Sequence, residues 1–136
     1  MPKFSQRSLD RLNTCHPDIQ AVMNEAIKHF DFTVLSGFRS PKEQLELYKQ
    51  GREFKDGKWV KVGKTVTNVD GINVKSNHNY SPSRAVDIAP YPIDWDNIER
   101  FEQMAVVVMD CANKLGIKLT WGGDWRMKDY PHFELS

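Results

Sequence analysis

The stretch "SNHNYSPSRAVDIAPYP", residues 76–92, combines a polar, turn-rich segment with a short expected β-strand, and the rest of the fold can be placed around that strand. Side chains alternate between the two faces of a strand, so Val86 and Ile88 are expected in the core and Asp87 on the other face. The alanines on each side of Asp87 leave room for a group to reach its carboxylate. His78 precedes this strand and is one of only 4 histidines in the chain. The stretch therefore predicts a sheet with an apolar core on one face and a polar site on the other.

The segments around this strand alternate between helical and extended patterns. Helices are expected from His16-Pro17 to residue 30, over residues 41–48 from a capping box of Ser40 and Glu43, and from an Asp94 cap to Gly116. Strands are expected over residues 31–38, in a hairpin of 52–55 and 58–62 around Asp56-Gly57, and over 85–91, 117–121 and 132–135. This order favours an α+β fold with a mainly antiparallel sheet. Residues 63–83 are expected to form a long polar loop, and such loops in small domains are often functional.

Length and composition limit the class of protein. With 136 residues, 40% hydrophobic and 27% charged, the chain is expected to form a single globular domain over residues 1–136. The net charge of +1 indicates neither a nucleic-acid surface nor a membrane surface, and the basic cluster at residues 55–64 is interpreted as a solvated loop. No apolar run is long enough to span a bilayer. Cys15 and Cys111 lack CxxC spacing, so two buried thiols are favoured, although a disulfide stays open.

The final expected strand repeats the pattern of the first. Phe133 and Leu135 share one face, while His132 and Glu134 share the other. A catalytic zinc ion takes three protein ligands from His, Asp and Glu and keeps a fourth position for water. Such a set is available in His78, Asp87 and His132. From the residues alone, a hydrogen-bonded buried carboxylate and a structural histidine near the C-terminus remain the alternative.

Other polar residues have expected roles beside these ligands. His16 and His29 stand at a helix start and a helix end, which suits capping or surface positions better than metal binding. Asp129 stands three residues before His132, in a turn that Pro131 keeps from being helical, so its carboxylate is a candidate base for a water molecule. Arg39 follows an expected strand, where its planar guanidinium can stabilise an oxyanion or hold a carboxylate, with a surface salt bridge as the alternative.

Four segments in this order carry a family resemblance: "SGFRSPKEQLELYKQG", "SNHNYSPSRAVDIAPYPIDW", "LGIKLTWGGDW" and "DYPHFEL". Over roughly residues 30–135 the chain resembles the zinc peptidases of the D-alanyl-D-alanine carboxypeptidase and L-alanyl-D-glutamate endopeptidase family, and especially their small single-domain phage endolysins. The resemblance implies an α+β domain whose antiparallel sheet carries one Zn²⁺. It implies His78, Asp87 and His132 as ligands, Asp129 as catalytic base and Arg39 as the group that polarises or positions the substrate. It also implies Gln44 and Ser76 as lining of the substrate groove.

Two further features bear on this resemblance. Many family members have a shorter spacing of the "HxxGxAxD" kind, and "HNYSPSRAVD" is two residues longer, which residues 81–83 can absorb as a bulge. Trp121 and Trp125, with the glycines between them, are suited to an aromatic rim of a peptide groove; for Trp121, core packing is the alternative.

The function expected from the resemblance is zinc-dependent hydrolysis of a peptidoglycan stem-peptide bond, as an L-alanyl-D-glutamate endopeptidase that lyses a phage host. The alternatives are a D-alanyl-D-alanine carboxypeptidase of the same chemistry, a non-catalytic zinc-binding module and a structural phage protein. The expected partner is the stem peptide, with no nucleic acid and no membrane, and the chain is expected to be a monomer. The N-terminal segment "MPKFSQRSLDRL" lacks an apolar signal region. We therefore expect a protein made in the host cytoplasm and released to the wall by a separate pore.

Overall fold

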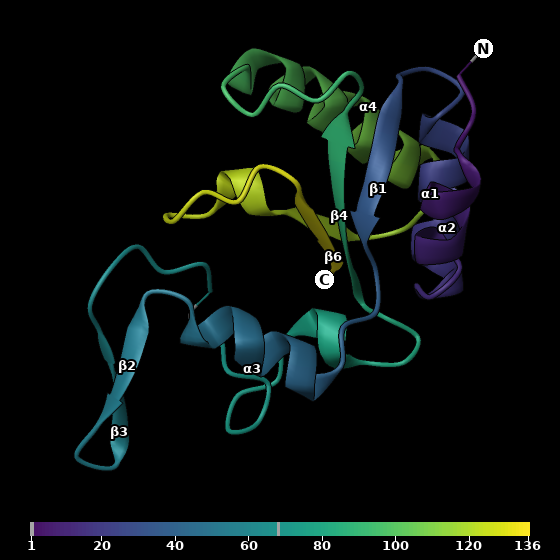
Figure 1. Ribbon diagram of the computed structural model, residues 1–136. Coiled ribbons are helices and arrows are strands. Elements are labelled where there is room, and N and C mark those ends of the chain that lie inside the picture. Colours follow the sequence, from purple (N-terminus) through teal and green to yellow (C-terminus); the bar gives the residue numbers. More distant parts are fainter. Residues whose placement is uncertain (1, 68) are drawn as a thin grey trace.

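The computed structural model describes residues 2–67 and 69–136. Its four longer helices are α1 (Gln6–Leu12), α2 (Pro17–Ala26), α3 (Pro41–Lys49) and α4 (Ile98–Leu115), and its short 3₁₀ helices are η1 (Asn77–Asn79) and η2 (Gly122–Asp124). The strands are β1 (Phe32–Ser36), β2 (Arg52–Lys55), β3 (Lys58–Lys61), β4 (Ala85–Pro90), β5 (Leu119–Trp121) and β6 (His132–Leu135). Figure 1 places α1, α2 and α4 beside β1 and β4, and α3 with the β2–β3 hairpin in the lower part of the view.

The main sheet is antiparallel throughout, with the strand order β1-β4-β6-β5. β2 and β3 form a separate two-stranded sheet. Helices and a mainly antiparallel sheet confirm the predicted α+β class. No helix among the described residues is both long enough and apolar enough to cross a membrane.

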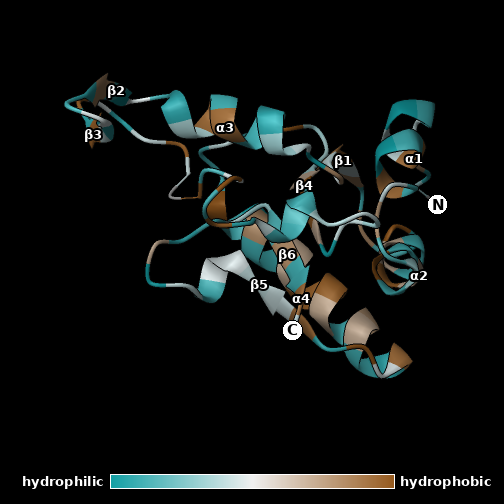
Figure 2. Ribbon diagram, turned by 90° about the horizontal axis from the view of Figure 1, so that it is seen from below, coloured by the Kyte–Doolittle hydropathy of each residue, from teal (hydrophilic) through white to brown (hydrophobic). Residues whose placement is uncertain are grey.

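The core lies where α2 and α4 pack together against the sheet. Val86 and Ile88 of β4 and Phe133 of β6 are completely buried, as the alternating pattern predicted. Facing them are the apolar sides of the two helices, and Figure 2 shows brown and teal blocks alternating along α4. Buried helical residues in this core are Ile19, Val22, Met23, Ala26, Phe101, Met104, Ala105, Val108, Cys111 and Ala112. Cys15 and Cys111 are both free and buried.

Several predicted boundaries are confirmed with a physical cause. Asp56 and Gly57 both have positive φ angles, 50° and 79°, which a tight two-residue hairpin requires. Ser40 and Glu43 form the reciprocal capping box of α3. Gly116 ends α4 in the left-handed conformation with a φ of 71°.

Two predictions of the local structure need correction, and one helix was not predicted. α4 begins after Asn97, whose side chain accepts from the N–H of Arg100; Asp94 is not the cap, because its carboxylate accepts from the N–H of Asp96 in the preceding turn. α2 ends at Ala26 rather than near residue 30. α1 had not been predicted; Ser5 caps it, Leu12 is buried in the core, and the buried Ser8 hydroxyl accepts from the Val34 N–H of β1.

Candidate metal centre and cleft

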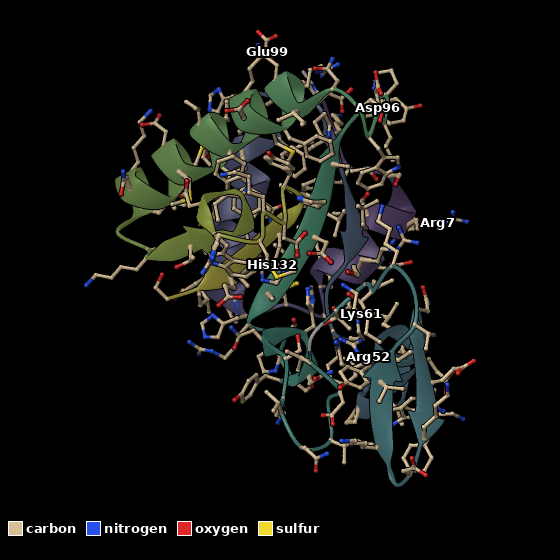
Figure 3. All side chains as sticks on the ribbon, turned by 90° about the vertical axis from the view of Figure 1, so that its left-hand side faces the viewer. Arg7, Arg52, Lys61, Asp96, Glu99 and His132 are labelled. Carbon is tan, nitrogen blue, oxygen red and sulfur yellow. The ribbon has the colours of Figure 1, made fainter. Side chains whose placement is uncertain are left out.

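Three potential ligand residues meet on the face of the sheet opposite the core. Asp87 in the middle of β4 lies directly across from His132, the first residue of β6, so their side chains share this face. His78 comes from η1, which lies within the long loop predicted over residues 63–83. One donor atom from each of the three lies within 4.8 Å of the others, so the group could hold a metal ion. The sequence prediction of the same three residues thus agrees with their placement. Figure 3 labels His132 near the middle of the molecule.

The orientation of the His78 ring suits a metal ligand. Its Nδ1 lies 2.8 Å from the carbonyl oxygen of Gly37, and because a carbonyl only accepts, Nδ1 carries the hydrogen. Nε2 is then the atom with the lone pair. Within residues 2–67 and 69–136, His78 Nε2 is the one buried side-chain nitrogen or oxygen without a hydrogen-bond partner. It lies 3.4 Å from Asp87 Oδ2. A buried polar atom without a partner is costly, and a bound cation would satisfy it.

His132 is held between two carboxylates. Its Nδ1 lies 3.1 Å from Asp87 Oδ1, and its Nε2 lies 2.7 Å from Glu134 Oε1. Glu134 in turn accepts a hydrogen bond of 2.7 Å from the side-chain amide of Asn77. Burial alone would lower the pKa of His132, but the hydrogen bonds with Asp87 and Glu134 outweigh it and raise the pKa to about 9. A metal ion bound by Nδ1 would replace the proton there, while Glu134 keeps the Nε2–H oriented.

Asp87 remains ionised in this environment. Burial alone would raise the pKa of its carboxyl group, but the His132 and His78 imidazoles hold the pKa well below its ordinary value. Ser36 donates a hydrogen bond of 3.1 Å to Oδ2 from the end of β1. An ionised, oriented carboxylate is the form that binds a cation.

Arg39 lies inside the site and not in a surface salt bridge. Its Nη2 is 3.4 Å from Asp87 Oδ2, and its side chain is only 17% exposed. Its Nη1 donates a 2.8 Å hydrogen bond to Gln44 Oε1. Its backbone N–H also donates to the carbonyl oxygen of His78 at 2.7 Å. Arg39 is therefore fixed between a potential metal ligand and α3.

Asp129 stands at the edge of the three potential ligands without joining them. Its Oδ2 is 4.0 Å from His132 Nδ1, and half of its side chain is exposed. Burial of the rest, followed by the negative charge of Asp87, raises the pKa of Asp129 above its ordinary value. The turn is held by the Asp129 N–H, which donates to the Gly122 carbonyl oxygen at 2.9 Å. Any side chain at Gly122 would overlap the backbone of Asp129, so this position requires glycine.

A cleft of about 430 Å³ opens beside these residues. Its lining includes the potential ligands, Asp129 and Arg39, and also Gln44, Ser76 and Trp125. The amide of Gln44 is fully engaged, since it accepts from Arg39 and donates to Thr67 Oγ1 and the Val69 carbonyl oxygen. Gln44 thus holds Arg39 and the segment of Thr67 and Val69 in place beside the cleft.

The aromatic rim consists of Trp125 and not of Trp121. Trp125 lines the cleft, with its ring centroid 5.0 Å from that of His132. Trp121 does not line the cleft: its ring is stacked on Phe133, and its Nε1 donates to the carbonyl oxygen of Tyr130 at 2.8 Å. The alternative of core packing fits Trp121.

Sequence reasoning missed two supporting residues. Asn77 stands beside a potential ligand in the sequence and binds Glu134, so it connects η1 to β6. Gly37 supplies the carbonyl that fixes the His78 ring, and a side chain there would overlap the Thr14 hydroxyl and the Arg11 carbonyl oxygen. Neither contact follows from spacing, because both partners are distant in the sequence.

Comparisons with known proteins identify the family of the chain. The family model described as phage L-alanyl-D-glutamate peptidase matches residues 1–135. The peptidoglycan L-alanyl-D-glutamate endopeptidase CwlK of Bacillus subtilis is 39% identical over 119 residues, which are 81% of this chain and 64% of CwlK. The chain therefore spans less than two thirds of that relative. The L-alanyl-D-glutamate peptidase of Escherichia phage T5 is 27% identical over 139 residues, covering 98% of this chain and 89% of the phage protein.

A solved structure extends the likeness to the fold. The crystal structure of the Serratia marcescens L-Ala D-Glu endopeptidase ChiX matches with a TM-score of 0.74 and 28% sequence identity. The match covers 98% of this chain and 90% of ChiX. The α+β architecture is therefore that of a known peptidase.

Proposed function

The chain belongs to the phage L-alanyl-D-glutamate peptidase family, and from this premise we propose that it is a zinc-dependent endopeptidase that cuts the L-alanyl-D-glutamate bond of peptidoglycan stem peptides. One observation carries the zinc assignment. The buried Nε2 of His78 has no hydrogen-bond partner and faces Asp87, which lies beside His132. Two imidazoles and one carboxylate are the ligand types of a catalytic zinc site with an open position. A zinc ion held there would supply a Lewis acid and lower the pKa of a bound water to about 7.

The chain's own residues support the hydrolytic step. Asp129, half-exposed at the cleft and with a raised pKa, accepts the proton of the attacking water and passes it to the leaving amine. Glu134 keeps the His132 ring oriented through its Nε2–H.

Arg39 orients Asp87 and also stabilises the negative charge of the transition state. Its guanidinium holds Asp87 in place and brings a permanent positive charge to the cleft, where the peptide carbonyl develops negative charge. Gln44 fixes Arg39 from α3. Ser76 and Trp125 line the same cleft, and both are placed to contact a bound peptide.

The presence of Asp129 supports an enzyme over a zinc-binding module, because a module that only binds needs no base. We further propose that residues 1–136 act as a single peptidase domain and as a monomer on the wall polymer.

Mass spectrometry of fragments released from purified peptidoglycan tests the assignment. An L-alanyl-D-glutamate endopeptidase releases peptides that begin with D-glutamate. Free D-alanine without such peptides would instead show a carboxypeptidase. No released fragment from zinc-loaded protein would point to a binding module.

A further inference from the structure

The β2–β3 hairpin concentrates positive charge that the rest of the chain lacks. Between Arg52 and Lys64 the chain carries five basic and two acidic side chains, a local charge of +3. The whole chain carries 19 basic and 18 acidic residues, a net charge of +1. The remainder is therefore slightly negative, and the hairpin is the cationic part of the molecule.

The register of the hairpin places like charges opposite each other. Arg52 pairs with Lys61, and Lys55 pairs with Lys58, so two of the four cross-strand pairs are between cations. Like charges directly opposite destabilise a sheet, and an isolated two-stranded sheet is marginal in water. A hairpin with only a structural role would be expected to pair opposite charges, so this arrangement indicates a function for the positive charge.

Most of this charge is unneutralised. Lys55 forms an ion pair of 3.2 Å with Glu53. Lys58, Lys61 and Lys64 are exposed, and no carboxylate of the described part of the chain pairs with any of them. These three lysines, here called the hairpin lysines, are thus accessible to an anionic partner.

The hairpin is joined to the wall of the cleft by the chain and by hydrogen bonds at its base. It connects α3, which carries Gln44, to the segment of Thr67 and Val69, and all three residues line the cleft. At its base the Arg52 guanidinium donates 2.8 Å hydrogen bonds to the carbonyl oxygens of Tyr48 and Thr67. Figure 1 shows the hairpin projecting beyond α3, and Figure 3 labels Arg52 and Lys61 on it, apart from His132. A polymer whose side branch enters the cleft would extend past the β2–β3 hairpin.

We propose that the β2–β3 hairpin is a docking arm that binds the carboxylates of the peptidoglycan polymer outside the cleft. The inference rests on the proposed function, which places a stem peptide in the cleft. Each L-alanyl-D-glutamate unit keeps one free carboxylate after its two peptide bonds are made, so the wall presents a repeating array of anions. The hairpin lysines are opposite in charge to this array.

The test compares two charge-matched triple variants. Lys58→Gln/Lys61→Gln/Lys64→Gln removes the hairpin lysines, and Lys28→Gln/Lys114→Gln/Lys118→Gln removes three exposed lysines elsewhere. Both are made in an Asp129→Asn background so that the polymer stays intact during co-sedimentation with purified peptidoglycan. At low ionic strength, the hairpin variant should bind on the order of tenfold more weakly, and its binding should lose most of its salt dependence. The control variant should bind as the parent does.

Two further measurements identify the partner. In the first, the carboxylates of peptidoglycan are converted to amides. The parent should bind this amidated polymer weakly, with the same affinity as the hairpin variant has for untreated peptidoglycan. With Asp129 restored, all variants should cleave a short soluble stem peptide at the same rate, because such a peptide does not extend to the arm.

Several results would overturn the docking arm. The control variant could lose as much peptidoglycan binding as the hairpin variant, or the hairpin variant could bind as tightly as the parent. The parent could also bind amidated peptidoglycan as tightly as untreated peptidoglycan, or bind phosphatidylglycerol vesicles as tightly as peptidoglycan. Failure of every protein to cleave the soluble peptide would instead contradict the proposed function, while the sedimentation results would still decide the role of the hairpin.

Discussion

The Nδ1 atom of His78 lies 2.8 Å from the carbonyl oxygen of Gly37, at the end of β1, and this contact turns Nε2 toward Asp87. The main sheet thus fixes the tautomer of a residue that comes from a distant loop. A preoriented imidazole loses little conformational freedom when it binds a metal, so the site is organised before the metal arrives.

Metal content should depend on the two histidines of the site. The protein should bind about one equivalent of zinc, as a single mononuclear site requires. His78→Ala and His132→Ala should each lose most of it, because two remaining ligands hold zinc weakly. His16→Ala and His29→Ala, whose rings lie at the ends of α2 or beyond, should keep it. Elemental analysis measures all four, and retention of metal in both site variants would refute the ligand assignment.

Glu134→Gln should weaken zinc binding without removing a ligand. The Glu134 carboxylate accepts from both the His132 ring and the Asn77 amide, whereas glutamine has only one acceptor oxygen for the two donors. Zinc affinity should fall by roughly 10–100-fold, the usual effect of losing a partner behind a ligand. Competition with a fluorescent chelator measures it, with the exposed Glu99→Gln as the control. Equal affinities in the two variants would show that Glu134 does not orient His132.

The sequence predicted the parts of this site that local patterns encode. Alternation in β4 and β6 assigned Asp87 and His132 to the polar face, since strand geometry leaves no other choice. The capping box of Ser40 and Glu43 and the Asp56-Gly57 turn were likewise local and were confirmed. The chemistry of their side chains made His78 and Asp129 candidates for this site, and the family resemblance assigned their roles as ligand and base.

What the sequence did not predict depends on contacts between distant segments. The short helix α1 is capped by Ser5 and buries Leu12, and its Ser8 hydroxyl accepts from the Val34 N–H of β1, a contact that no local pattern indicates. Trp121 and Trp125 stand four positions apart in one glycine-rich segment. Trp121 nevertheless stacks on Phe133 and packs against the core, whereas Trp125 lines the cleft. Tertiary packing, and not composition, determines which of two such residues is buried and which lines a cleft.

The buried thiol of Cys15 should resist alkylation in the folded protein. Burial raises the pKa of Cys15 to about 12. A raised thiol pKa favours the neutral form, so at pH 8 only about one thiol in ten thousand is the reactive thiolate. Iodoacetamide should therefore leave Cys15 unmodified at pH 8 and modify it fully in denaturant, as peptide mass spectrometry can follow. Cys111, whose pKa is also raised by burial, should be protected as well. Rapid labelling of Cys15 in the native protein would contradict its burial.

Arg39→Lys should lower turnover although it keeps the positive charge. The guanidinium reaches Gln44 and Asp87 with different nitrogens, and a single ammonium cannot reproduce this fork. Hydrolysis of peptidoglycan should slow by at least about tenfold, with zinc content unchanged. Arg7→Lys, at an exposed position of α1, is the matched control and should be fully active. Unchanged turnover in Arg39→Lys would mean that charge alone is needed at this position.

Asp129→Asn separates an enzyme from a zinc-binding module. Asparagine keeps the size and hydrogen-bonding capacity of the side chain but removes the basic site, and the turn at Gly122 depends only on the backbone of residue 129. Because the carboxylate lies 4.0 Å from His132 and outside the three potential ligands, the variant should fold, keep its zinc and still bind peptidoglycan. Its hydrolysis rate should fall by on the order of 10²–10⁴-fold, the usual effect of losing a positioned base. Asp124→Asn, in the adjacent η2, should retain full activity.

Loss of zinc from the Asp129 variant would make Asp129 a ligand, and loss of folding would make it structural. Full activity would transfer the role of base to Glu134, the other carboxylate of the cleft outside the ligand set.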